Sequence, residues 1–277
     1  MRLWILFFCV VTSVFFSCTV SNNVKEDNSL APFFSPNGVN GCFAIMNNAT
    51  GQFTTYNLSR YRDSSYSPAS TFKIIHSLIG LQTGVISGDS MVIQWDGVTR
   101  AIPEWNKNLT MYEAFRVSAV PYYQEVARRI GKDTLNVWLD SLKYGLKSAK
   151  DTFRIRTAVD SFWLDNSVKV TPDEQLGIIK RLYFNQLPFY KSYQESVKRA
   201  MFQESNTKYR MGYKTGLGQT ENGNQLGWVV GWIEENNHPY FFVLNVEPSD
   251  QTLDLASVRL KMLTDILDHL GFRKGER

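Results

Sequence analysis

Cysteine is scarce in this chain of 277 residues, which contains three. Cys9 lies in an apolar leader, Cys18 directly follows that leader, and Cys42 stands alone in an apolar segment. We therefore predict no internal disulfide, and we expect Cys42 to be a core residue rather than a reactive thiol.

Histidine and long runs of one charge are equally rare. The three histidines, His76, His238 and His269, lie far apart and share no ligand spacing, so we expect no metal site. Thirty basic and 26 acidic side chains give a modest net charge of +4 without a basic run. Nucleic acid is therefore not an expected partner. With 43% hydrophobic residues, the chain can instead bury a large core.

The N-terminus has the pattern of an export signal. A short basic start precedes an almost wholly apolar run, Leu3 to Phe16, which is too short to span a bilayer. Ser17-Cys18 closes this run and resembles a bacterial lipoprotein cleavage box. We expect a lipoprotein-type signal peptide at 1–17, lipidation of Cys18, and a polar tether at 18–30. If Cys18 is lipidated, we expect the mature protein to be a periplasmic, membrane-anchored lipoprotein. The alternative is ordinary secretion, with Cys18 as an incidental residue.

The remaining residues, 31–277, are predicted to form one α+β domain. Two strands at 41–47 and 52–57, joined by a turn, begin the domain, and three more at 209–214, 226–234 and 240–246 end it. Helical patterns fill the region between, and a last amphipathic helix is stopped by Gly271. The sequence therefore predicts a mixed, mainly antiparallel sheet built from both chain ends. A helical subdomain is inserted into it, with the site in the cleft between them.

The stretch Ser67-Pro68-Ala69-Ser70-Thr71-Phe72-Lys73 indicates a tight turn that delivers Ser70 to the first turn of a buried helix. Lys73 lies one turn further on the same face, so a hydroxyl and an amine are paired as nucleophile and candidate base. A capping serine with a solvated lysine is the alternative. The chain contains its own comparison, because Ser205 and Lys208 have the same spacing without an apolar helix behind them.

Three further segments could carry chemistry. Lys214-Thr215-Gly216 follows a predicted strand, where an ammonium and a hydroxyl can meet an anionic substrate and Gly216 permits close backbone approach. Ser118-Ala119-Val120 lies on a connector between helices, and Trp163 lies in an aromatic segment. Taken singly, each has an ordinary reading as a strand end, a helix cap or a core residue.

The order and spacing of these motifs together resemble the class D (OXA-type) serine β-lactamases. Ser-x-x-Lys at a helix start, Ser-x-Val, Phe-Trp-Leu and Lys-Thr-Gly follow one another along the chain. Supporting matches are Trp95-Asp96-Gly97, the segment 105–110, the segment 226–232, and Arg259, expected ahead of the final helix. The likeness runs from about Gly41 to Leu270.

The resemblance implies β-lactam hydrolysis and the penicillin-recognising fold. Ser70 would form an acyl-enzyme, and Lys73, carbamylated by carbon dioxide or bicarbonate, would be the general base. No dissociable cofactor is implied. A lysine in a dry pocket near a helix N-terminus is disfavoured in its charged form, as carbamylation requires. Val120 and Trp163 would help to form that pocket, with the indole N–H donating to the carbamate.

The resemblance also implies roles for the other residues. Ser118 would relay a proton to the leaving nitrogen, and the backbone N–H groups of Ser70 and Leu217 would form the oxyanion hole. A substrate carboxylate would be held by Lys214, Thr215 and Arg259, with Gly216 beside them.

One departure and three rival functions stay open. The family usually has Tyr-Gly-Asn where this chain has Tyr144-Gly145-Leu146, so an amide that can pin the loop is missing. The rivals are a β-lactam sensor that stays acylated, a D-alanyl-D-alanine peptidase and a non-enzymatic binding protein. The expected removable leader disfavours the sensor, and Val120 disfavours the peptidase. Substrate range and oligomeric state are not indicated by the sequence.

Overall fold

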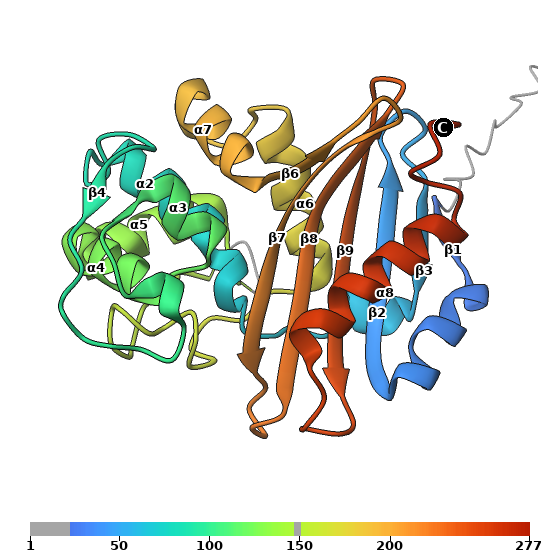
Figure 1. Cartoon of the computed structure of the whole chain (residues 1–277), viewed down its shortest axis with the longest axis horizontal. Coiled ribbons are helices and arrows are strands. Elements are labelled where there is room, and N and C mark those ends of the chain that lie inside the picture. Colours follow the sequence, from blue (N-terminus) through green and yellow to red (C-terminus); the bar gives the residue numbers. More distant parts are fainter. Residues whose placement is uncertain (1–22, 147–150) are drawn as a thin grey trace, which may run out of the picture.

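Strands from both ends of the chain meet in one sheet (Figure 1). The computed structural model describes residues 23–146 and 151–277. The strand order is β1-β3-β2-β9-β8-β7-β6, and every neighbouring pair is antiparallel except β1 and β3. This confirms the predicted mixed, mainly antiparallel sheet. Its strands are β1 (Val24–Glu26), β2 (Val39–Asn47), β3 (Phe53–Tyr56), β6 (Phe202–Ser205), β7 (Arg210–Gln219), β8 (Gln225–Glu235) and β9 (His238–Pro248).

Helices cover both faces of the sheet and form the inserted subdomain (Figure 1). Helix α8 packs on one face, against β8 and β9, and α6 packs on the opposite face. The subdomain of α2 to α5 lies beside β7 and carries the small β4–β5 sheet. Within the described residues, no helix is both long and apolar enough to cross a membrane. The bounds are α1 (Leu58–Asp63), α2 (Lys73–Gln82), α3 (Met111–Arg116), α4 (Val120–Ile130), α5 (Lys132–Leu142), α6 (Pro172–Tyr183), α7 (Lys191–Met201), α8 (Leu255–His269), β4 (Val92–Ile93), β5 (Leu109–Thr110), and the 3₁₀ turns η1 (Asn28–Phe33), η2 (Ser35–Asn37), η3 (Ala69–Phe72) and η4 (Pro103–Trp105).

The central strands are buried on both faces, which explains their almost unbroken apolar sequence. Along β8, Trp228 and Val230 join the core on the side of the helical subdomain, whereas Val229 and Ile233 join the core under α8. This alternation is the two-residue period of a strand. Cys42 is fully buried in β2, as expected of a core residue.

The folded domain begins earlier than the sequence predicted. Residues 18–30 were expected to be a tether, but Val24–Glu26 pairs with β3 and Leu30 is fully buried under α8. Backbone hydrogen bonding to the edge of the sheet holds this segment, and its polar composition gives no sign of that. The signal peptide at 1–17, Cys18 and the rest of the tether up to residue 22 lie outside the described residues.

Strand β7 is longer than predicted, and this changes the position of the Lys-Thr-Gly motif. The strand was expected at 209–214, with Lys214 at its end, but it continues to Gln219. The glycines that suggested a turn, Gly216 and Gly218, lie within the strand. A Cβ on Gly216 would lie 3.2 Å from the carbonyl oxygen of Pro68, and one on Gly218 would lie 3.0 Å from the Ala69 Cβ. The glycines therefore let β7 pack closely on η3.

Candidate active site

Ser70 lies in η3, immediately before α2, rather than inside the α-helix as the sequence suggested. Its turn is held from two sides. The Ser67 hydroxyl and the Ala69 N–H both donate to the main-chain oxygen of Trp163, at 2.8 and 3.1 Å. The indole N–H of Trp228 donates to the Ser67 carbonyl at 2.9 Å. Ala69 has a φ of +49°, a left-handed conformation that a side chain disfavours, so these contacts hold a strained turn next to the serine.

Lys73 begins α2 and is fully buried. Its Nζ donates to the Ser70 Oγ at 2.9 Å and lies 5.4 Å from the centre of the Tyr123 ring. Burial lowers the pKa of Lys73 to about 7 because the apolar surroundings disfavour the ammonium. Near neutral pH, a large fraction of this amine is therefore uncharged and can accept a proton or react with an electrophile.

The pocket behind Lys73 is aromatic. Phe72 stacks near Trp163, with ring centroids 6.1 Å apart, and Phe162 meets Trp163 edge to face at 5.3 Å. The Trp163 Nε1 is buried and has no hydrogen-bond partner among the described residues. Val120 is the first residue of α4 and is partly buried, two residues after Ser118.

Ser118 lies on the connector between α3 and α4, with a left-handed φ of +57°. Its Oγ accepts a hydrogen bond from the Lys214 Nζ at 3.0 Å. Lys214 also donates to the Thr215 carbonyl at 3.0 Å and lies 5.6 Å from the centre of the Phe115 ring. Burial holds the pKa of Lys214 well below its usual value, and the nearby cations Lys73, Arg259 and Arg116 add to the effect.

The remaining strand residues line the edge of the sheet. In the described structure, β6 pairs with β7 only along Arg210–Gly212, so the outer edge of β7 beyond that point has no neighbouring strand. Thr215 is partly buried there, and Leu217 is 41% exposed. Since η3 packs on Gly216 and Gly218, the main chain of Leu217 lies beside the turn that carries Ser70.

Arg259 lies inside α8, which corrects the expectation that it precedes the final helix. The side chain is buried and donates through Nη1 to the Gly216 carbonyl, while its Nε has no partner among the described residues. Burial lowers the pKa of Arg259 to about 10, so the guanidinium still carries its charge at neutral pH. Asp254 caps the helix by accepting from the Ser257 N–H.

The site is short of negative charge. Lys73, Lys214 and Arg259 are all buried, and none forms an ion pair with an acidic side chain of the described residues. Such a set of basic groups, of which Arg259 keeps its charge at neutral pH, favours an anion in a site of low dielectric constant.

Sequence reasoning missed the residues that hold the serine turn through the main chain. Trp228 was recognised only as part of an apolar strand, although its indole binds the Ser67 carbonyl. Gln175 on α6 was not singled out; its amide donates to the Thr71 Oγ1 at 2.6 Å, and Thr71 in turn donates to the Pro68 carbonyl at 2.7 Å. A buried glutamine on an amphipathic helix was the available signal.

The departure at Tyr144-Gly145-Leu146 lies at the margin of the described structure. Leu146 is partly buried and packs against the core of the helical side, and residues 147–150 are outside the described residues. Tyr144 packs on Phe72, with ring centroids 5.4 Å apart, so the segment supports the wall of the pocket.

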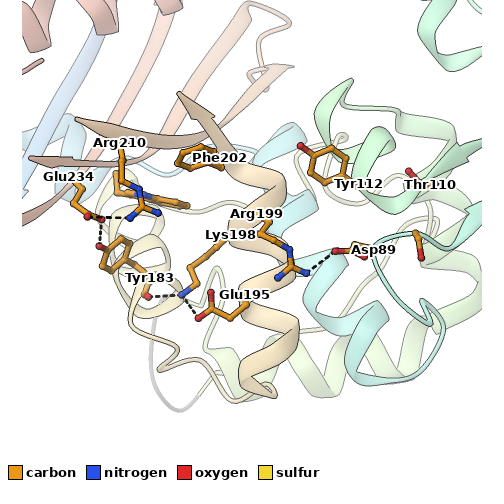
Figure 2. Close-up of a pocket in the computed structure, with 12 residues that line it drawn as sticks. Asp89, Thr110, Tyr112, Tyr183, Glu195, Lys198, Arg199, Phe202, Arg210 and Glu234 are labelled. Carbon is orange, nitrogen blue, oxygen red and sulfur yellow. Dashed lines mark hydrogen bonds and ion pairs between the residues drawn. The ribbon is translucent and has the colours of Figure 1, made fainter. Parts of the chain in front are cut away.

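A separate cavity of about 850 Å³ lies between α7 and strands β6 to β8 (Figure 2). None of the candidate site residues lines it. The cations in it are already paired: Arg199 with Asp89, Lys198 with Glu195, and Arg210 with Glu234. The first pair joins α7 to the loop before β4, the second lies within α7, and the third joins β7 to β8. None of the residues that line the cavity forms a serine–lysine pair.

Comparison with known proteins agrees with this geometry. The family model for the penicillin-binding protein transpeptidase domain matches residues 41–268. β-Lactamase OXA-11 of Pseudomonas aeruginosa is 33% identical over 96% of this chain and 97% of its own length. The chain belongs to the class D β-lactamase family. The crystal structure of FUS-1 (OXA-85), a class D β-lactamase from Fusobacterium nucleatum, covers 89% of this chain and 98% of that one, with a TM-score of 0.81 and 30% identity.

The chain also has a lower likeness to a regulatory protein. The regulatory protein BlaR1 of Bacillus licheniformis is 29% identical over 89% of this chain, but the match covers 39% of that protein. Family membership confirms the resemblance inferred from the motifs, together with the penicillin-recognising fold.

Proposed function

We propose that the protein is a serine hydrolase that opens the β-lactam ring through an acyl ester on Ser70. One observation carries the proposal: the buried Lys73 amine, with a pKa of about 7, donates to the Ser70 Oγ at 2.9 Å. An ordinary solvated lysine would be protonated at neutral pH and could not take the serine proton.

Acylation uses both serine–lysine pairs. The Ser70 Oγ attacks the β-lactam carbonyl carbon and gives its proton to Lys73; the new C–O bond forms, and the carbonyl π pair moves to the oxygen. The N–H groups of Ser70 and Leu217 would stabilise that oxyanion. The carbonyl then re-forms as the C–N bond breaks, and the ring nitrogen takes a proton from Ser118, which regains one from the Lys214 Nζ. Because the Ser118 Oγ accepts from Lys214, its own O–H is free to point toward the substrate.

The substrate's carboxylate fits the cationic edge of the site. Lys214, Thr215 and Arg259 lie on or against β7, whose outer edge beyond Gly212 has no neighbouring strand in the described structure. An anion entering here would offset both the burial and the neighbouring positive charges that lower the pKa of Lys214. A strand edge also offers main-chain groups to the amide of the antibiotic.

Hydrolysis of the ester requires a base that can activate water. Lys73 fits carbamylation, because its amine is partly neutral and the buried Trp163 Nε1 beside the pocket lacks an acceptor. Carbon dioxide bound to Nζ would supply a carboxylate able to act as general base. Trp163 would donate to that carboxylate, and the aromatic rings would keep bulk water from it. No dissociable cofactor is proposed.

The test is steady-state hydrolysis of a chromogenic cephalosporin by the purified chain from residue 23 onward, with and without added bicarbonate. We expect continuous turnover, enhanced by bicarbonate and absent in Ser70→Ala. A single stoichiometric burst of hydrolysis would instead support a β-lactam sensor that stays acylated, or a peptidase. No reaction at all would leave a binding protein and overturn the proposal.

We also propose that the protein is exported and anchored by lipid at Cys18. The basic start, the apolar run and Ser17-Cys18 support this proposal. Cells making the full chain should incorporate labelled palmitate into it and retain it in the membrane fraction. Cys18→Ser should abolish both; labelling that persists in this variant would contradict the lipid anchor.

A further inference from the structure

His76 is a buried histidine on the same helix face as Lys73. It lies three residues further along α2 and is fully buried. Its ring meets Trp163 edge to face, with centroids 4.4 Å apart, and meets Phe72 in the same way at 4.5 Å. Residues three apart on a helix are neighbours, so the imidazole lies close to the reactive lysine.

Both nitrogens of His76 lack a hydrogen-bond partner among the described residues. A neutral imidazole carries one donor and one acceptor, and burying them unpaired costs free energy. The Trp163 Nε1 is unpaired as well. Two contacting rings therefore present N–H donors without acceptors in the wall of the pocket around Lys73. An apolar ring of similar size would fill the same space without that cost, so the arrangement points to an acceptor that binds there.

The charges around His76 favour an anion at the lysine. Burial holds the pKa of His76 well below its usual value, and the Lys73 ammonium adds to this effect. Tyr123, on α4, stacks on His76 with centroids 5.9 Å apart, and its hydroxyl is bonded to the Ser77 hydroxyl at 2.7 Å. Burial also raises the pKa of Tyr123, so the phenol stays neutral. The Lys73 ammonium is an unfavourable neighbour of His76. A carboxylate on the Lys73 Nζ would instead accept a hydrogen bond from the imidazole.

We propose that His76 is a positioning residue that donates an imidazole N–H to the carbamate of Lys73 and, with Trp163, stabilises it. This inference rests on the carbamylation proposed above. In the modification, the neutral Nζ lone pair forms an N–C bond to carbon dioxide. One C–O π pair moves to oxygen, and an Nζ proton leaves to solvent. His76 takes no part in bond making; it fixes the resulting carboxylate in place.

The first experiment titrates the protein with ¹³C-labelled bicarbonate and integrates the carbamate resonance by NMR. Because a hydrogen bond to a charged group is roughly twice as strong as a neutral one, His76→Phe should raise the half-saturating bicarbonate concentration about tenfold or more. His76→Asn keeps a hydrogen-bond donor, so its half-saturating bicarbonate concentration should lie between those of the unmodified protein and His76→Phe. Phe153→Leu is the packing control: Phe153 is buried behind Phe162, with ring centroids 6.3 Å apart, and its side chain has no polar atom, so half-saturation should stay near that of the unmodified sequence.

The second experiment needs no variant. With ¹⁵N-labelled histidine, the His76 imidazole resonances should shift in step with the ¹³C carbamate signal, while His238 and His269 stay unchanged. A carbamate that forms without moving the His76 resonances, or with the same half-saturation in His76→Phe, overturns this inference and leaves the proposed base intact. Absence of any carbamate signal in the unmodified protein overturns both.

Discussion

The Lys214 Nζ donates to the Ser118 Oγ at 3.0 Å, and this bond joins strand β7 to the connector between α3 and α4. The site thus contains two serine–lysine pairs, one at the start of α2 and one between the subdomain and the sheet. In the first pair, Lys73 donates to the hydroxyl that would lose a proton in the proposed mechanism. In the second, Lys214 donates to the hydroxyl that would deliver one. In that mechanism, the two halves of the fold divide the proton transfers between them.

Replacing Lys73 with Ala should leave slow acylation and trap the acyl-enzyme. Ser70 and the oxyanion donors remain, whereas the base that activates water is lost, and a positioned base contributes about 10²–10⁴-fold. Intact-protein mass spectrometry after mixing with a penicillin should show the ester accumulating. Lys208→Ala is the matched control, because Ser205 and Lys208 repeat the spacing in an exposed segment. Unimpaired deacylation in Lys73→Ala would remove Lys73 from its assigned role.

Lys73 should also make stability depend on pH. Its pKa is about 7 in the folded chain and near 10.5 when exposed, so between these values the unfolded chain binds more protons. The free energy of unfolding then rises with pH, and the cost of the buried ammonium is greatest below pH 7. Relative to Lys73→Met, the unmodified protein should gain on the order of 2 kcal/mol between pH 6 and pH 9.

Urea denaturation at the two pH values, in buffer freed of carbon dioxide, measures this difference. Lys208→Met serves as the control and should show no such change, because its side chain is exposed. A Lys73→Met difference that is independent of pH would mean that Lys73 stays charged in the folded protein.

The chemistry-bearing residues could be found from the sequence because their spacing is local. Ser70 and Lys73 are three residues apart, and the Lys73 Nζ donates to the Ser70 Oγ in the structure. The full length of the strand that carries Lys214 could not be found in this way. Gly216 and Gly218 look like turn residues in a local window, and only the approach of η3 to β7 shows why a strand needs them there.

Contacts between segments far apart in the sequence could not be predicted either. The hydrogen bond from Trp228 to Ser67 spans 161 residues, and no local pattern indicates which buried tryptophan has a main-chain partner. His76 was dismissed because it lacks ligand spacing with the other histidines. Its unpaired nitrogens become visible only once Trp163, from another part of the chain, is packed against it.

Lys214→Gln should weaken the recognition of the substrate's carboxylate. The loss of one charge-assisted contact predicts a fall in kcat/KM of about 10- to 100-fold for a penicillin. The fall should be smaller for the methyl ester of the same penicillin, which has no carboxylate to lose. Lys169→Gln, which removes a lysine paired with Glu221, is the control and should leave both substrates unaffected. An equal fall in kcat/KM for the acid and the ester would mean that Lys214 acts through its contact with Ser118 and does not bind the substrate's carboxylate.

Trp228→Phe should destabilise the turn that carries Ser70. The substitution leaves the buried Ser67 carbonyl without its indole donor, a loss that typically costs about 1–3 kcal/mol of unfolding free energy. Because Ser67 also donates to the Trp163 carbonyl, the loss should extend to the position of Ser70 and slow acylation. Trp138→Phe is the matched control, since Trp138 stacks on Phe189 outside this network. Urea denaturation and the rate of acyl-enzyme formation should separate the two variants. If Trp228→Phe is acylated as fast as Trp138→Phe, the Trp228 indole contributes to folding alone and does not position Ser70.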